Sequence, residues 1–327
     1  MSDGNCFTDG YVSSGVTNAA RSDTLFQLGL QGILLSDYGH DPADSIQTEI
    51  RGLWGEIVEV YTHRKLKLKT DRLPALSGIA ARFGQALQDE YKAGLWESVL
   101  PFELLWKVDN IRETALELRP QQYQGPSWSW ASLDVPVRTM IPESSYGEAD
   151  VCIQVIACHI KIPAASANFS LYDASFGAVE LGSLELRGRL QMAEWILLIP
   201  SSGDLIDARN TLRKGIGNGP DAKLPTVMHP DAEEPELEQH NGGHIPVFLL
   251  KIFMPQRPSL RKATWDLRGL VLKQNGDSTY SRLGVFESYQ SLLEESLQAQ
   301  AQEQKSRKFQ QYAEWLDSPP LQIITIV

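Results

Sequence analysis

The sequence has few cysteines and an excess of negative charge. Only three of its 327 residues are cysteine, and a chain of this length does not depend on disulfides, so a reducing compartment is expected. Lysine and arginine total 30 against 41 acidic residues, which gives a formal net charge of −11. Such a balance repels phosphate backbones and anionic lipid. Binding to nucleic acid or to a membrane surface is therefore disfavoured.

Long hydrophobic runs are also missing. Residues 25–35 form an apolar stretch near the start, but two glutamines and two glycines interrupt it. The first five residues carry no positive charge that would precede a signal sequence. Neither a signal peptide nor a membrane span is expected, and the sequence predicts a cytoplasmic protein.

The sequence motifs of common catalytic, metal and phosphate sites are absent as well. No Gly-x-Ser-x-Gly elbow occurs. His240 and His244 are four residues apart, but Asn-Gly-Gly between them breaks the helix that would place both imidazoles on one face. A glycine-rich segment at 214–219 runs into Pro220 instead of a helix that could hold a phosphate. We therefore predict no bound metal and no cofactor.

Helical patterning begins at Ser45. Apolar residues at steps of three and four predict a helix of about four turns, namely Ile50, Leu53, Trp54, Ile57, Val58 and Tyr61. A second helix is expected over 73–88, with Asp71 as its cap and Pro74 in its first turn. These helices define a helical segment at 45–94, which follows an irregular arm at 1–44.

Beyond the helical segment, short apolar runs separated by Gly, Pro, Ser and Asp predict strands. They lie at 104–108, 127–131, 151–156, 179–190, 195–199, 247–250 and 270–272. We expect a β-rich domain at 95–287 with a mobile loop at 201–243, then a C-terminal helix and short strand at 288–327. The predicted fold class is α+β, mainly β, with N-terminal helices packed on an antiparallel β barrel or propeller-like domain.

Several segments are familiar as a set. The most specific are Asp-Arg-Leu-Pro-Ala-Leu-Ser-Gly-Ile-Ala at 71–80 and Pro-Ser-Trp-Ser-Trp-Ala-Ser at 126–132, with further pieces at 54–61, 93–96, 104–106 and 280–286. In order and spacing they resemble the region C-terminal to the heterokaryon-incompatibility (HET) domain of fungal proteins, over about residues 45–290. The opening and ending motifs of the HET core are absent from 1–44. The resemblance implies a fungal origin and a related fold, without the family's cell-death activity.

The aromatic residues support two interpretations. Trp54 and Tyr61 lie on the first helix, and four more tryptophans lie in or beside predicted strands: Trp96, Trp106, Trp128 and Trp130. Trp128 and Trp130 would point to one face of a strand, because side chains alternate. The rings could pack the core, since aromatic residues dominate core energetics. They could also form the wall of a ligand pocket.

The pocket interpretation leads to an enzyme hypothesis. A cofactor-independent enzyme of fungal secondary metabolism would bind an apolar polyketide or terpenoid intermediate against these six rings. It would promote dehydration, cyclisation or a pericyclic (Diels–Alder-type) addition by holding a reactive conformer. Arg64 and Arg282 would polarise a carbonyl group, and Asp134 would transfer a proton if burial raised its pKa.

The alternative hypothesis is a non-enzymatic interaction module derived from a HET-type protein. Residues 288–316 would then form a helix that binds a protein partner. Its interrupted apolar face consists of Leu292, Leu293, Leu297, Phe309, Tyr312 and Leu316. The same face could instead pack on the chain's own β domain.

Overall fold

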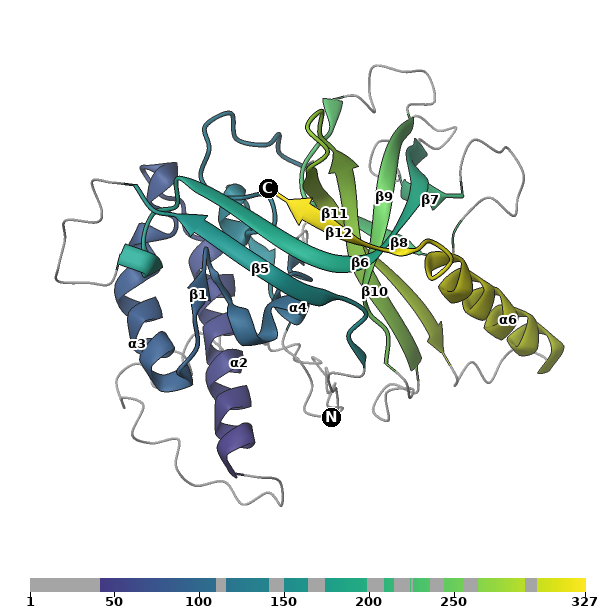
Figure 1. Ribbon diagram of the computed structural model, residues 1–327, viewed down its shortest axis with the longest axis horizontal. Coiled ribbons are helices and arrows are strands. Elements are labelled where there is room, and N and C mark those ends of the chain that lie inside the picture. Colours follow the sequence, from purple (N-terminus) through teal and green to yellow (C-terminus); the bar gives the residue numbers. More distant parts are fainter. Residues whose placement is uncertain are drawn as a thin grey trace, which may run out of the picture.

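A large mixed β-sheet forms the centre of the molecule, with helices α2 and α3 at one end and α6 at the other (Figure 1). The computed structural model describes residues 42–109, 116–140, 150–163, 174–198, 209–214, 224, 226–235, 244–255, 264–291 and 299–327. Strand exceeds helix in this part of the chain. The prediction of a mainly β fold with a C-terminal helix is confirmed, while the predicted arm at 1–44 lies almost wholly outside the described residues.

The helices are α2 (Pro42–Thr62), α3 (Ser77–Leu87), α4 (Leu100–Glu103) and α6 (Ala299–Leu316). Two short strand pairs join β1 (Tyr91–Lys92) to β2 (Leu95–Trp96) and β3 (Lys107–Val108) to β4 (Val137–Arg138). The large sheet contains β5 (Gln154–Lys161), β6 (Leu181–Leu198), β7 (Arg209–Arg213), β8 (Val227–Pro230), β9 (His244–Phe253), β10 (Thr264–Gln274), β11 (Tyr280–Ser291) and β12 (Leu321–Ile326).

The apolar spacing after Ser45 does form a helix. Ile50, Trp54 and Val58 lie one turn apart on α2 and are buried in the main core. The second helix begins later than expected, because Pro74–Leu76 is a 3-10 helix and α3 starts at Ser77. The prediction that Asp71 caps α3 is wrong, since Asp71 ends a separate 3-10 helix.

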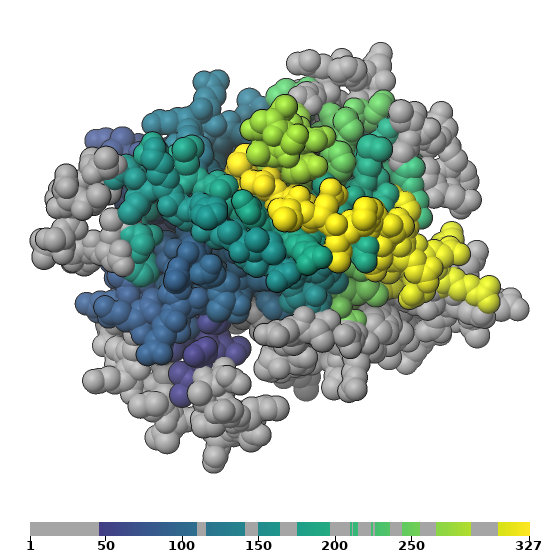
Figure 2. Space-filling model, in the orientation of Figure 1, coloured from purple at the N-terminus to yellow at the C-terminus, as the bar shows by residue number. Residues whose placement is uncertain are grey.

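Strand β6 organises the large sheet. It has 18 residues and pairs with β5, β7, β9 and β12, all antiparallel. Figure 2 shows β6 (teal) and β12 (yellow) crossing one face of the molecule side by side. The remaining order runs from β12 through β11 to β8. The β11–β12 pairing is parallel, so the sheet is mixed where an antiparallel one was predicted.

Both faces of the sheet carry apolar side chains. On β9, Leu250 and Ile252 belong to the core shared with α2 and α3, whereas Val247 and Leu249 belong to a second core. The second core includes Phe309, Tyr312 and Leu316 of α6. Because side chains alternate along a strand, one face of the sheet packs against the core that contains α2 and α3, and the opposite face packs against α6.

Two tryptophans predicted to lie on a strand lie in a turn. Ser129 precedes the 3-10 helix Trp130–Ser132, where its Oγ accepts a hydrogen bond from the Ala131 amide at 3.0 Å and donates one to Ala93 O at 2.5 Å. A serine hydroxyl that bonds neighbouring backbone groups competes with strand formation. Trp128 and Trp130 therefore do not share a sheet face.

Two further boundaries differ from the prediction. The segment 201–243, expected to be one long loop, contains β7 and β8, and most of its other residues lie outside the described structure. The C-terminal helix was expected from residue 288, but Ser288 and Tyr289 pair with β10 opposite Leu267 and Asp266. Residues 292–298 lie outside the described residues, and α6 is assigned from Ala299.

Gly94 has a conformation and a neighbour that exclude a side chain. Its φ is 103°, and a Cβ there would lie 2.6 Å from Trp130 Nε1. Trp130 Nε1 also donates a hydrogen bond to Gly94 O at 3.0 Å. We expect Gly94→Ala to lower the free energy of unfolding by about 2 kcal/mol or more, from backbone strain and overpacking.

Urea denaturation measures this effect, with Gly52→Ala as the matched control. A Cβ at Gly52, within α2, meets no atom within 4 Å. That substitution should raise the free energy of unfolding by about 0.5–1 kcal/mol, from helix propensity. If both substitutions changed the free energy of unfolding with the same sign and size, the steric constraint assigned to Gly94 would be contradicted.

Candidate functional site

Arg282 lies at the centre of a buried polar network. The β10–β11 register shifts so that Leu272 faces Arg282 and Val271 faces Gly284, which leaves Leu283 as an extra residue. A bulge of this kind redirects the neighbouring side chains. Arg282 is fully buried, and its guanidinium carbon lies 3.5 Å from the centroid of the Trp106 ring.

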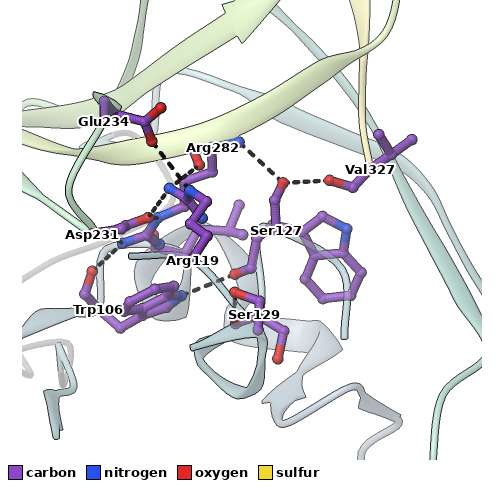
Figure 3. A network of polar contacts seen from close by, with 11 residues as sticks. Trp106, Arg119, Ser127, Ser129, Asp231, Glu234, Arg282 and Val327 are labelled. Carbon is purple, nitrogen blue, oxygen red and sulfur yellow. Dashed lines mark hydrogen bonds and ion pairs between the residues drawn. The ribbon is translucent and has the colours of Figure 1, made fainter. Parts of the chain in front are cut away.

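The guanidinium of Arg282 is fully engaged within the protein. Its Nε and Nη2 donate to the two Asp231 carboxylate oxygens at 2.9 and 3.1 Å, while Nη1 donates to Leu104 O at 2.6 Å and Nη2 to Trp106 O at 2.5 Å (Figure 3). Burial lowers the pKa of Arg282, and the Asp231 carboxylate opposes that shift. Carbonyl polarisation, the role predicted for Arg282, would need a free N–H donor that faces a cavity. The guanidinium instead joins β11 to Asp231 and to the backbone of Leu104 and Trp106, so its role is structural.

The other two predicted catalytic residues lie elsewhere. Arg64 is exposed just beyond the end of α2. Asp134 is held by Arg72, whose Nη1 lies 3.3 Å from Oδ1, and by Lys69. Within the described structure, no hydrogen bond or ion pair joins Arg64, Asp134 and Arg282 to one another. The three residues do not form one site.

The predicted aromatic residues gather in the core. The five tryptophans are each at most 2% exposed. Trp54 lies 5.5 Å from Trp96, and Tyr61 lies 6.3 Å from Trp130, between ring centroids. A cavity lined by Trp54, Trp106 and Trp130 has a volume of about 20 Å³. That is room for about one water molecule. A polyketide does not fit there.

Glu103 lines the same small cavity and was not identified from the sequence. Its Oε2 accepts a hydrogen bond from the Trp96 amide at 2.5 Å. Burial raises the pKa of Glu103 to about 8, although Arg51 acts in the opposite direction. The available signal was its position as the single charged residue between Ser98 and Trp106. A carboxyl group so perturbed is a marker of functional or strained sites.

A much larger cleft opens beside β5 and β6, with a volume of about 660 Å³. Ile326 of β12 lies opposite Leu184, so the first three residues of β6 extend past the end of β12. On their other side they pair with β5. The cleft is lined by residues from five stretches of chain: Arg119, Pro120, Gln122–Gly125, Ser127, Ser132, His159–Lys161, Leu181–Ser183 and Val327.

The lining of the cleft combines apolar and cationic groups. Ile160, Leu181 and Tyr123 contribute apolar surface, and none of the described lining side chains is acidic. The two lining cations, Arg119 and Lys161, are paired with Glu234 and Glu180. Gln124 is 8% exposed, and its buried Oε1 has no hydrogen-bond partner among the described residues. Small-molecule sites typically occupy about 300–1,000 Å³ and mix apolar walls with a few polar groups. The cleft has the size and composition of such a site.

The walls of the cleft are fixed to the buried network (Figure 3). Arg119 donates to Glu234 at 3.2 Å through Nε and to Arg282 O at 2.8 Å through Nη2. Ser127 Oγ accepts a hydrogen bond from the Arg282 amide at 3.0 Å and donates one to Val327 O. Arg119 and Ser127 therefore hold the cleft against β11 and β12.

Other reactive groups in the described part of the chain give no sign of a catalytic centre. Among the described residues, no group of three His, Cys, Asp or Glu side chains is placed to hold a metal ion. Burial raises the pKa of both described thiols, that of Cys158 to about 12, so neither is a reactive nucleophile near neutral pH. No helix in the described ranges has both the length and the apolar character of a membrane span.

Protein-family models, curated proteins and solved structures yield no match to this chain. The cleft was missed by sequence reasoning because its five stretches are distant in the chain and carry no shared motif.

We expect stability to depend on the protonation of Glu103. Its pKa is about 8 in the folded protein against an ordinary value of 4.5, so the folded state retains a proton that the unfolded state loses. The contribution is fully present below pH 4.5 and is lost as the pH rises through about 8. Glu103→Gln keeps an oxygen acceptor for the Trp96 amide and removes the titration.

Urea denaturation between pH 5 and 8.5 tests this expectation. The free energy of unfolding of Glu103→Gln, relative to the parent protein, should rise by about 2 kcal/mol or more across that range. A difference that stays constant with pH would show that Glu103 does not titrate abnormally.

We also expect the Arg282–Asp231 pair to be strongly coupled. Either Asp231→Leu or Arg282→Met alone leaves a buried polar partner uncompensated, which should cost about 3–5 kcal/mol of unfolding free energy. The double variant should cost clearly less than the sum of the two. Urea denaturation of the four proteins completes the cycle, and additive losses would contradict a coupled pair.

Proposed function

We propose that this protein binds a largely apolar small molecule in the cleft formed by residues 119–127, the end of β5 and the start of β6. The observation that supports the proposal is the cleft of about 660 Å³, whose walls combine apolar side chains such as Ile160 and Leu181 with a few polar groups. A cleft of this size and composition is typical of small-molecule sites.

This proposal keeps the apolar metabolite expected from the sequence and changes its location. The aromatic cluster leaves a cavity of about 20 Å³, whereas the cleft can hold a molecule of drug size. Cofactor-free cyclisation or pericyclic addition requires mainly that a reactive conformer be held. Under the enzyme hypothesis, the substrate would therefore be held and converted in the cleft.

We further infer a relationship to the region C-terminal to the fungal HET core. The resembling segments contact one another. The Ala93 and Gly94 carbonyls accept hydrogen bonds from Ser129 and Trp130, and Trp106 Nε1 donates to Trp128 O at 2.9 Å. Their shared role in packing supports a related fold and carries no activity with it.

We also propose that the large sheet closes into a small barrel. Strand β10 pairs with both β9 and β11, β9 pairs with β6, β6 with β12, and β12 with β11. Pairings that return to their starting strand favour a small barrel over a propeller. The cleft would then lie at the rim of this barrel, where the parallel β11–β12 contact is brief.

A protein-binding role for 288–316 gains less support. Phe309, Tyr312 and Leu316 are buried in the second core, so the apolar face offered to a partner is covered by the chain's own sheet. Leu292, Leu293 and Leu297 lie outside the described residues. We therefore place the function in the cleft and not on α6.

The proposal predicts that filling the cleft abolishes ligand binding. Ser183 lines the cleft on β6, and Ser183→Trp places an indole there without requiring a change of strand. The neutral naphthalene dye prodan, titrated by its fluorescence, serves as the apolar probe. We expect saturable binding to the parent protein and a loss of about tenfold or more in Ser183→Trp, because a filled cavity excludes the dye.

Met192→Trp is the matched control, because Met192 lies on the same strand, is 63% exposed and does not line the cleft. It should bind prodan as the parent protein does. Thermal unfolding of both variants checks that each is folded. An absence of saturable binding to the parent protein, or equal binding to both variants, would refute the proposed site.

A further inference from the structure

A basic loop, residues 63–69, follows the end of α2 on an otherwise acidic chain. We propose that this loop docks the protein on an anionic lipid surface. The inference goes beyond the proposed function and does not rest on it, because none of these residues lines the cleft.

The basic loop concentrates positive charge that the protein leaves unpaired. Its sequence, His-Arg-Lys-Leu-Lys-Leu-Lys, holds four lysines or arginines, all exposed, and no acidic residue. Lys69 is paired with Asp134, whereas Arg64, Lys65 and Lys67 form no ion pair with any described residue. Asp71 follows the loop and offsets one of these charges. Like charges so close together repel one another, which favours an anionic surface that neutralises them.

An exposed leucine lies among these cations. Leu68 is 60% exposed and stands between Lys67 and Lys69. Lysine side chains can reach lipid head groups while an apolar side chain enters the acyl boundary, and this combination is typical of interfacial anchors. Single-stranded nucleic acid usually stacks its bases on aromatic rings, and the basic loop contains none. The composition of the loop therefore favours lipid over nucleic acid.

The basic loop is held at both ends. The Arg64 N–H donates a hydrogen bond to Tyr61 O at 2.9 Å, and the Tyr61 hydroxyl donates one to Arg72 O at 2.9 Å, which closes the loop. Arg72 is buried and donates in turn to Asp134 and to Val135 O. A loop fixed in this way loses less conformational entropy when it docks.

The net charge of −11 does not decide the contact at close range. Exposed charges farther apart than about 8 Å are largely screened at physiological ionic strength. A lipid surface that touches the basic loop is therefore affected mainly by the cations of the loop. We place a lipid contact here, against the expectation drawn from the net charge alone.

Co-sedimentation of the full chain with sucrose-loaded vesicles tests the proposal. Phosphatidylcholine vesicles with about 30% phosphatidylserine should bind the protein about tenfold or more better than phosphatidylcholine alone, because each lysine or arginine near an anionic leaflet contributes about fivefold in affinity. Raising the salt from about 0.1 to about 0.5 M should reduce this preference, since salt screens the attraction.

Loop variants locate the contact. Lys65→Gln with Lys67→Gln should lower the affinity for the anionic vesicles about tenfold or more. Leu68→Ser should lower it about threefold and keep the preference for anionic vesicles, because it removes apolar contact and no charge. Arg187→Gln with Lys308→Gln is the matched control, since it removes two exposed cations from β6 and α6, and it should bind as the parent protein does. Thermal unfolding checks that each variant is folded.

Three results would overturn the proposal. The first is equal binding to the two kinds of vesicle, and the second is an equal loss in the loop variant and its control. The third is binding of poly-glutamate or single-stranded RNA, followed by fluorescence anisotropy, without binding of the anionic vesicles, because the loop would then serve an acidic protein or a nucleic acid. None of these results bears on the cleft, which prodan tests separately.

Discussion

The Arg282–Asp231 ion pair is the constraint on which the rest of the structure depends. A guanidinium with no exposed surface is strongly unfavourable unless it is hydrogen-bonded, and here four acceptor atoms from two other parts of the chain bond all three of its nitrogens. Asp231 follows β8, the carbonyls of Leu104 and Trp106 follow α4, and Arg282 itself lies on β11. These segments must adopt their positions together, because a missing partner would leave a charge in apolar surroundings without its hydrogen bonds.

The same network sets the position of the cleft. Arg119 and Ser127 bond the backbone of Arg282, so the segment that forms one wall is registered against β11. The opposite wall comes from the paired ends of β5 and β6. A site whose wall is held by a buried, hydrogen-bonded network is preorganised, which reduces the entropy lost when a ligand binds. The rigid core and the candidate site are thus parts of one arrangement.

Local patterns in the sequence predicted local structure well and assembled structure poorly. Helix α2 was identifiable because its apolar residues recur at helical spacing over about four turns, whereas Ser127–Ala131 looked like a strand because nothing local reveals that Ser129 bonds Ala93. Glu103 could have been found as a lone charge in an apolar run. The cleft could not, since Gln124 and His159 have no distinctive neighbours and meet only through the topology of the sheet.

The contrast between the aromatic cluster and the cleft shows which sequence features signal a site in this protein. Tryptophans attract attention because they are rare and large, yet large apolar rings gain most from complete burial, and these rings pack against one another. A binding site must instead leave volume and surface open to a ligand. The cleft beside β5 and β6 meets that condition with about 660 Å³, whereas the rings leave about 20 Å³ and Arg282 donates its hydrogen bonds within the protein. Open volume lined by apolar and polar groups is therefore the stronger physical indicator of function here.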